Sequence, residues 1–416
     1  MKLKNIFLTS ILFFLVLSSW YVLRAVRNEM AVENYDQDFL LVLLTFTSLV
    51  MLLVNPVYSW IVSKSNFKKI VIYCYSFLIL NLLIFFFYQQ SIQSEVLTQE
   101  WVNNRDKNLW LGRVFYVWAN IFSFFVVSIF WVLVINIFRD NSSRKFYGFI
   151  MAGGSLGAIF GSELAVQLSD SYTTSGLELF ILTSSILLIL AMFLAIYIFN
   201  SVTSQSLQKN VGGKWSDAIN NIITKDEVRL IALYSWFFTL LMTIQWITAI
   251  PIIQAYSDIS AERIVFFSRI EQLVSPLTLA TQLFLTYFVI SFIGIRLILV
   301  IYGALFVLVF SLYGFLPSVG VVVFAQATLR VFEYSFNKPS REIIYSELTK
   351  KDRYKSTVFI DTFLTRFGDL SGSIFVGLSK LIGLGITIVP IITIPFAALF
   401  SFVGFKISRH QKFKDL

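Results

Sequence analysis

The chain has 416 residues, of which 57% are hydrophobic and only 14% are charged, whereas an ordinary soluble domain carries about 25% charged residues. Its single cysteine, Cys74, excludes a disulfide framework, and its single histidine, His410, almost excludes a His-based catalytic triad or a His/Cys metal cage. The composition indicates a membrane protein, because twelve spans of about 20 residues would use about 240 residues, close to the apolar fraction.

Apolar runs bounded by charged or polar residues predict six spans in the first half of the chain. They cover residues 6–25, 39–62, 69–88, 112–138, 146–168 and 177–199. The first run is longer than the apolar core of a typical signal peptide, and no small-residue cleavage site follows it. We therefore expect it to be a retained helix.

A polar segment at residues 200–227 separates these spans from six more. The second set covers residues 228–252, 264–290, 293–315, 319–337, 356–379 and 384–406. The sequence thus predicts an all-α, major-facilitator-like fold of twelve transmembrane helices. It would consist of a six-helix bundle in residues 1–199, a cytoplasmic linker in 200–227 and a second six-helix bundle in 228–416.

The two halves carry weak echoes of each other. A shift of about 216 residues places Ser19-Trp20 on Ser235-Trp236, and it places the glycine-rich segment 153–157 on residues 369–373. Related halves around a substrate site near the bilayer midplane are typical of secondary transporters, which work by alternating access.

The net charge of +9 is distributed unevenly along the chain. If the N-terminus is cytoplasmic, the predicted cytoplasmic segments hold 23 of the 33 Lys and Arg residues, while the opposite loops, including Arg27 and Arg263, are acidic. This alternation predicts that both termini lie inside, in an inner (plasma) membrane. The basic residues are scattered over short connections rather than gathered on one face, so we expect no nucleic-acid partner.

Glycines in the fifth predicted span have a helical spacing. Gly153, Gly157 and Gly161 recur every fourth residue and form one small face against which another helix can pack closely. Gly154 and Gly368 are candidates for the bends that gating requires. Helix packing alone also explains all five positions.

Charged residues inside the predicted spans are the main candidates for a site, because an ionisable group in hydrocarbon needs a partner or a wet cavity. Arg330 and Glu333, like Arg366 and Asp369, are three residues apart and share a helix face. Each arginine could neutralise its neighbour, or the arginines could grip an anion while a carboxylate takes up a proton. The full set of candidate substrate-binding residues is Arg330, Glu333, Arg366, Asp369, Glu271, Glu163, Arg24 and Gln245.

The segments around the fourth and fifth spans resemble the ATP/ADP translocase family, the nucleoside triphosphate/diphosphate exchangers and their shorter bacterial relatives. The resemblance rests on Phe115–Trp131, Gly148–Ala158, Tyr21–Glu29, Tyr58–Lys64, Phe67–Lys69, Asn337–Glu342 and Arg353–Asp361. It implies a facilitator fold and the transport of an anionic metabolite, with a nucleotide among the candidates. The sequence lacks the intramembrane lysines that the resemblance associates with phosphate binding, which leaves other organic anions open.

The leading hypothesis is a secondary active transporter that moves a small anionic solute across the membrane. Nucleotide exchange and proton-coupled movement of another solute compete within it, and a non-transporting receptor or scaffold is the alternative from a different class. We expect no enzymatic activity, no cofactor and no metal, because neither His410 nor Cys74 belongs to a cluster of catalytic or metal-ligating residues. The expected partners are the substrate, the lipid bilayer and a coupling proton or counter-substrate, and we expect a monomer.

Overall fold

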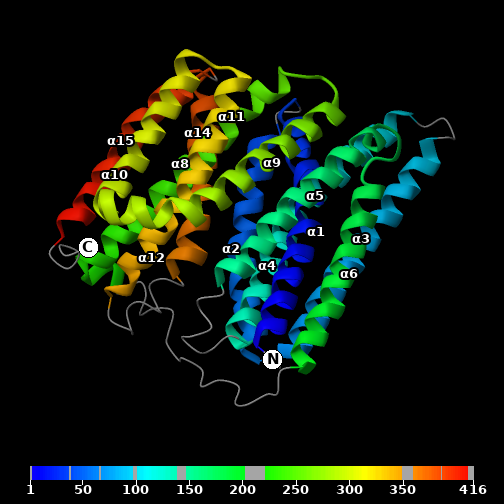
Figure 1. Cartoon of the computed structure of the whole chain (residues 1–416). Helices are drawn as coiled ribbons and strands as arrows, with labels where there is room; N and C mark the ends of the chain where they lie inside the picture. The colour runs from blue at the N-terminus through cyan, green and yellow to red at the C-terminus, as the bar shows by residue number, and fades with distance from the viewer. Residues whose placement is uncertain are drawn as a thin grey trace. The chain divides into compact units, whose positions relative to one another are not determined.

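The computed structural model describes residues 2–36, 39–64, 67–96, 101–137, 147–201, 221–348, 359–385 and 387–410, which are almost entirely helical (Figure 1). The predicted basic connection at 139–145 and most of the predicted linker, at 202–220, lie outside these residues, as do 349–358, which include the start of the Arg353–Asp361 segment. The fold class predicted from the hydrophobic pattern, an all-α polytopic protein, is confirmed.

The helices follow the predicted spans in order. The first half contains α1 (Lys2–Asp36), α2 (Leu40–Lys64), α3 (Phe67–Val96), α4 (Trp101–Ile137), α5 (Tyr147–Ser175) and α6 (Glu178–Ser201). The second half contains α8 (Asp226–Gln254), α9 (Ser260–Phe284), α10 (Thr286–Phe315), α11 (Val319–Phe332), α12 (Lys338–Ser346), α14 (Thr365–Leu381) and α15 (Ile388–Arg409). Two π-helical turns, η2 (Glu333–Asn337) and η3 (Ile360–Leu364), precede α12 and α14.

Nine helical segments in the described part of the chain are long and apolar enough to cross a membrane. Helix α2 contributes only Leu40–Val54 as a shorter apolar stretch, α9 carries several charges, and α14 has 17 residues. The count of twelve spans is consistent with this architecture and stays a prediction for these three helices.

Helix α1 extends beyond the end predicted from hydropathy. The sequence places the end of the first span at residue 25 and Arg27 and Glu29 in an outer loop, but α1 continues to Asp36 and Glu29 is fully buried. No glycine or proline interrupts this stretch, and the apolar residues 30–32 are buried among the charged ones, so the helix continues.

The boundary between the eighth and ninth spans also differs from the prediction. The predicted break is at residues 291–292, but α9 ends at Phe284 and α10 begins at Thr286. Gly294, inside α10, has φ of 80° and ψ of 152°, which interrupts the helix near the predicted break. Positive φ is readily adopted by glycine because it has no Cβ, so the kink falls at this residue.

Contacts within the chain define two compact units. Unit 1 comprises Met1–Gln37, Pro56–Asn210 and Ser257–Pro276, and unit 2 comprises Asp38–Asn55, Val211–Tyr256 and Leu277–Leu416. Helices α2 and α9 therefore contribute residues to both units. The division of the chain into two bundles joined at 200–227 stays a prediction.

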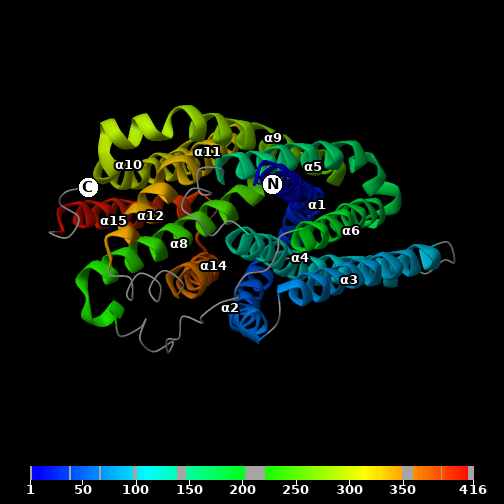
Figure 2. The same ribbon diagram turned by 60° about the horizontal axis from the view of Figure 1, so that its bottom comes forward.

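Unit 1 is built around α1, which packs against α4, α5 and α6, while α3 lies along α6 (Figures 1 and 2). The predicted small face of α5 lies on α1: a Cβ at Gly153 or Gly157 would overlap the carbonyl oxygens of Ser10 or Phe14. The Ser18 hydroxyl donates a hydrogen bond of 3.1 Å to the carbonyl of Gly157. Glycine thus allows the two backbones to approach closely.

In unit 2, α8 and α14 form a pair of the same kind. A Cβ at Gly368 would lie 2.9 Å from the carbonyl oxygen of Trp236, and one at Gly372 would lie 2.9 Å from that of Leu240. Helices α8 and α14 are the first and fifth spans of the second half, as α1 and α5 are of the first. The same small-residue packing recurs at equivalent places, which agrees with the sequence echoes between the halves.

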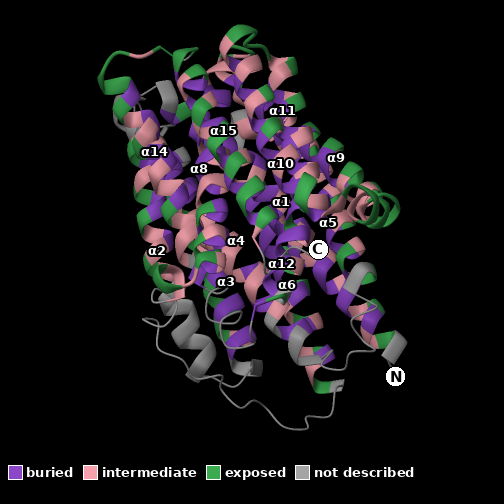
Figure 3. Ribbon diagram, turned by 90° about the vertical axis from the view of Figure 1, so that its left-hand side faces the viewer, coloured by how far each residue is buried: buried purple, intermediate pink, exposed green. Residues whose placement is uncertain are grey.

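Many large apolar residues are exposed. Figure 3 marks exposed positions along the helices. Leu53, Phe292 and Leu378 are 72%, 94% and 58% exposed. Surfaces of this kind would be unstable in water and match the hydrocarbon of a bilayer. The protein is a multi-pass membrane protein.

We expect Gly157→Ala to destabilise unit 1 by about 1–3 kcal/mol, because the added methyl group would force α5 away from the backbone of α1. Gly112→Ala on α4 is the matched control, since the nearest atoms to its Cβ would be those of the Met30 side chain, at an ordinary 3.6 Å or more. The control should be neutral or slightly stabilising. Unfolding midpoints of the purified variants would check this, and an equal effect of the two substitutions would contradict it.

Candidate functional site

Two crossed ion pairs join α1 to α9 within unit 1. Arg24 on α1 makes a bidentate contact with Glu271 on α9, at 3.1 and 3.0 Å. In the reverse sense, Glu29 on α1 accepts hydrogen bonds of 2.8 and 3.0 Å from Nε of Arg263 on α9. Paired guanidinium and carboxylate groups satisfy each other, so both helices can carry charges in a buried place.

Arg27 lies next to these pairs on α1 and has a different set of neighbours. It donates a hydrogen bond of 2.8 Å to Asn120 on α4 and bonds of 3.2 and 2.6 Å to Asn28. Its guanidinium carbon lies over the rings of Trp20 and Tyr116, at 5.4 and 5.7 Å from their centroids. These amide and aromatic partners fix the orientation of the guanidinium group.

A second arginine of α4 extends this polar region. Arg113 is 9% exposed, donates a 2.7 Å hydrogen bond to Asn34 of α1, and lies 4.6 Å over the ring of Trp110. We refer to Arg24, Arg27, Arg113, Asn120 and Tyr116 as the α1–α4 arginine cluster. It places three guanidinium groups and an aromatic ring within one unit.

Glu163 of α5 lies in a more open place. It is bound by Gln272 of α9 at 2.6 Å and by Arg269 at 3.6 Å, and its side chain is 43% exposed. An exposed pair of this kind contributes little to stability. Glu163 therefore has polar partners on α9 but is not buried, and its substrate-binding role stays a prediction.

In unit 2, Glu333 is held by a residue that the sequence did not single out. Its carboxylate accepts a 2.7 Å hydrogen bond from Arg341 and one of 2.5 Å from Asn337, whose amide oxygen accepts 2.7 Å from the Tyr234 hydroxyl. Residues 333, 337 and 341 are four apart and begin in the π-helical turn η2, so they share a face. Arg341, placed by the sequence in a cytoplasmic connection, is buried. π-Helical turns are rare and frequent at functional sites.

Arg366 and Asp369 form the local pair that their spacing predicts. The guanidinium of Arg366 contacts the carboxylate of Asp369 at 3.0 Å, and Thr243 of α8 donates to the same carboxylate at 3.1 Å. Gly368, between them, lies against α8. The Arg366 side chain is 36% exposed, which leaves it open to a solute.

The other two candidates in unit 2 are buried. Gln245 donates a 2.8 Å hydrogen bond to the Tyr313 hydroxyl and accepts one of 3.3 Å from Gln326, so both ends of its amide are bound by neighbouring helices. Arg330 is 7% exposed at the C-terminal end of α11. The substrate-binding roles of all the sequence candidates stay predictions.

The sequence reading missed Arg27, Glu29, Arg263 and Arg341 because it placed them in loops. A signal for Arg27 was present: Trp20, Arg24, Arg27 and Asn34 lie on one stripe at positions i, i+4, i+7 and i+14, once the helix is continued past residue 25. The partners of Glu29 and Arg24 are more than 200 residues away, and a single sequence carries no signal for them.

The described part of the chain contains no group of three or more His, Cys, Asp and Glu residues placed to hold a metal ion.

The sequence matches no protein-family model, and a search of curated proteins gave no match. Solved structures are similar to it. A point mutant of the nucleoside transporter NupG is 12% identical, with a TM-score of 0.64, over 98% of this chain and 100% of that one. A bacterial homologue of the human lysosomal transporter Spinster, inward-facing and unoccupied, is 11% identical, with a TM-score of 0.57, over 100% and 98%. A point mutant of the E. coli fucose:proton symporter FucP is 14% identical, with a TM-score of 0.55, over 98% and 100%.

These similarities cover nearly the whole chain, and each of the three neighbours is a transporter. At such low identity they establish the fold and do not extend to the substrate. The chain has the all-helical fold of major facilitator transporters.

We expect Arg263→Gln to destabilise the protein by about 3–5 kcal/mol, because it leaves the carboxylate of Glu29 buried without its main partner. The double variant Glu29→Gln/Arg263→Gln removes both charges and should recover a large part of this loss. Unfolding by denaturant titration of the two single variants and the double variant gives the coupling energy. Strictly additive losses would contradict the pairing.

The exposed pair of Arg229 and Asp226 on α8 is the control for this measurement. Arg229→Gln should change stability by less than about 1 kcal/mol, since both groups keep their water when the partner is removed.

Proposed function

We propose that the protein is a secondary active transporter that moves a small anionic solute across the plasma membrane by alternating access. The fold supports transport, since its neighbours are a nucleoside transporter, a Spinster homologue and a sugar:proton symporter. The observation that carries the anionic substrate is Arg27, whose half-buried guanidinium group on α1 is oriented by amide oxygens and aromatic rings.

The α1–α4 arginine cluster has the chemistry that an anion needs. Arginine stays charged in any environment, and its planar fork of donors matches the oxygens of a carboxylate or phosphate. Trp20 and Tyr116 fix the plane of Arg27 by cation–π contact, which lowers the entropy lost when an anion binds. A solute that carries one or more negative charges is therefore favoured over a cation.

A nucleotide is the anionic substrate that would use both the guanidinium and the aromatic groups of the α1–α4 arginine cluster. Its phosphates would bind the guanidinium group of Arg27, and its base would stack on an aromatic side chain such as Tyr116. The resemblance of Phe115–Trp131 to the ATP/ADP translocases and the NupG neighbour, which is a nucleoside transporter, both support this choice.

Proton-coupled movement of a non-nucleotide solute is the second candidate. FucP is a fucose:proton symporter, and Glu29, Glu333 and Asp369 are carboxylates at buried or half-buried positions that could exchange a proton with the medium. In both cases we propose that the termini are cytoplasmic and that the monomer is the working unit.

Counterflow in proteoliposomes distinguishes the two candidates. Vesicles loaded with unlabelled ADP should take up labelled ATP without an imposed proton gradient if the protein exchanges nucleotides. Adenosine and inorganic phosphate, tested separately, show whether base and phosphate are both required. Uptake of a different solute only under a proton gradient would favour the second candidate, and the absence of any solute movement would favour a receptor or scaffold.

We expect Arg27→Gln to weaken the apparent substrate affinity by about 10- to 100-fold, the loss typical of one charged hydrogen-bonding group. Arg27→Lys should restore little, because an ammonium group lacks the planar fork. Arg269→Gln, with a 59% exposed side chain on α9, is the matched control and should transport normally. Equal uptake by all three variants at limiting substrate would overturn the role of Arg27.

Variants of unit 2 test the candidates taken from the sequence. Arg330→Gln and Arg366→Gln should abolish transport while leaving folded protein in the membrane, if these residues take part in the substrate pathway. Transport rates should be normalised to the amount of monodisperse protein. Normal uptake by both variants would restrict the site to the α1–α4 arginine cluster.

A further inference from the structure

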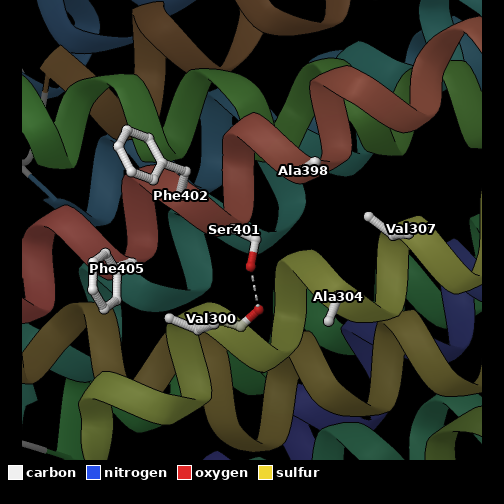
Figure 4. A pocket seen from close by; sticks show the side chains of 7 residues that line it. All are labelled: Val300, Ala304, Val307, Ala398, Ser401, Phe402 and Phe405. Carbon is white, nitrogen blue, oxygen red and sulfur yellow. Dashed lines mark hydrogen bonds between the residues drawn. The ribbon is translucent and has the colours of Figure 1, made fainter.

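A groove runs between α10 and α15 in unit 2 (Figure 4). The two helices pack closely because Gly303 lies against Ser401 and Gly404 lies against Leu299. The groove has a volume of about 350 Å³, at the lower end of ligand-sized pockets, which span about 300–1,000 Å³. Its lining residues are Val300, Ala304, Val307, Ala398, Ser401, Phe402 and Phe405.

The lining offers an occupant almost entirely apolar contacts. Ser401 is its one hydroxyl-bearing residue, and this hydroxyl donates a 2.8 Å hydrogen bond to the carbonyl of Val300, as Figure 4 shows. Ala304 and Ala398 are small and exposed, so they leave the groove open on the side away from the larger Phe402 and Phe405 (Figure 4). A hydrocarbon chain fits such a lining better than a polar solute does.

Cations lie at one end of this groove. The Lys406 ammonium group is 5.0 Å from the ring centroid of Phe402, and the Arg409 guanidinium is 4.5 Å from that of Phe405, so both cover the rings that line the groove. Arg296, exposed one turn before Val300, lies at the same end because α10 and α15 are antiparallel, with Leu299 beside Gly404 and Gly314 beside Ile391.

No carboxylate accompanies these cations on their own helices. Thr286–Phe315 and Ile388–Arg409 contain no Asp or Glu. Within the described residues, Arg296, Lys406 and Arg409 form no ion pair. Three cations beside an apolar groove form a surface that is complementary to a molecule with an apolar chain and an anionic head.

We propose that the α10–α15 groove is a binding site for an anionic glycerophospholipid. One acyl chain lies along Ala304 and Ala398, and the phosphate is bound by Lys406 and Arg409 with Arg296 nearby. Basic pockets between transmembrane helices bind anionic head groups in this way. A zwitterionic lipid brings its own cation to the same place, so the site selects net negative charge.

Native mass spectrometry of the full-length protein in detergent tests the proposal with phosphatidylglycerol and phosphatidylethanolamine of identical chains as probes. The unmodified protein should retain phosphatidylglycerol more strongly. Lys406→Gln/Arg409→Gln should weaken its binding by about fivefold for each charge removed. Lys225→Gln/Arg229→Gln, which removes two cations on or next to α8, is the matched control and should bind like the unmodified protein.

A second variant tests the groove separately from its charges. Ala304→Leu/Ala398→Leu fills the space from two exposed positions, so the fold should persist while lipid retention falls. Inorganic phosphate in excess should not displace the lipid, because it lacks the chain. Equal retention of the two lipids by the unmodified protein, or loss of retention in the α8 control alone, would overturn the proposal.

Discussion

The cost of burying charge is the constraint on which the rest of unit 1 depends. An isolated charge in hydrocarbon or in a protein interior costs several kcal/mol, so each buried charge needs a partner. Arg24 on α1 pairs with Glu271 on α9, and Glu29 on α1 pairs with Arg263 on α9. Each helix therefore contributes one positive and one negative charge. A helix that is too charged to be stable alone in a membrane becomes stable beside α1. The polarity of α9 thus follows from its neighbour rather than from its own hydropathy.

Close packing of small residues provides the second constraint. Helices in a bilayer gain no hydrophobic driving force from pairing, so they depend on van der Waals contact and interhelical hydrogen bonds. Gly153 and Gly157 supply this contact between α1 and α5, and Gly368 and Gly372 supply it between α8 and α14. Each pair joins the first and fifth spans of its half. The same physical solution at equivalent places explains why the sequence echo is strongest in these helices.

Hydropathy predicted where the helices lie because apolar runs are a local property of the chain. The three-residue spacing of Arg366 and Asp369 predicted their pair because one helical turn joins them. Hydropathy ended the first span at residue 25 because charges normally mark the membrane boundary. Glu29 violates that rule only because Arg263, 234 residues away, neutralises it. A long-range pair of this kind cannot be read from one sequence, which is why loops were expected where the structure has buried helix.

The arginines of unit 1 consequently divide into two kinds. Arg24 and Arg263 are paired with carboxylates, so their charges are used to hold α9 against α1. Arg27 contacts amide oxygens and aromatic rings, which fix the direction of its guanidinium group. An anion gains most from a guanidinium group that is already oriented and still charged. The fixed orientation of its guanidinium group is the reason why Arg27 is proposed as the place where an anionic solute binds.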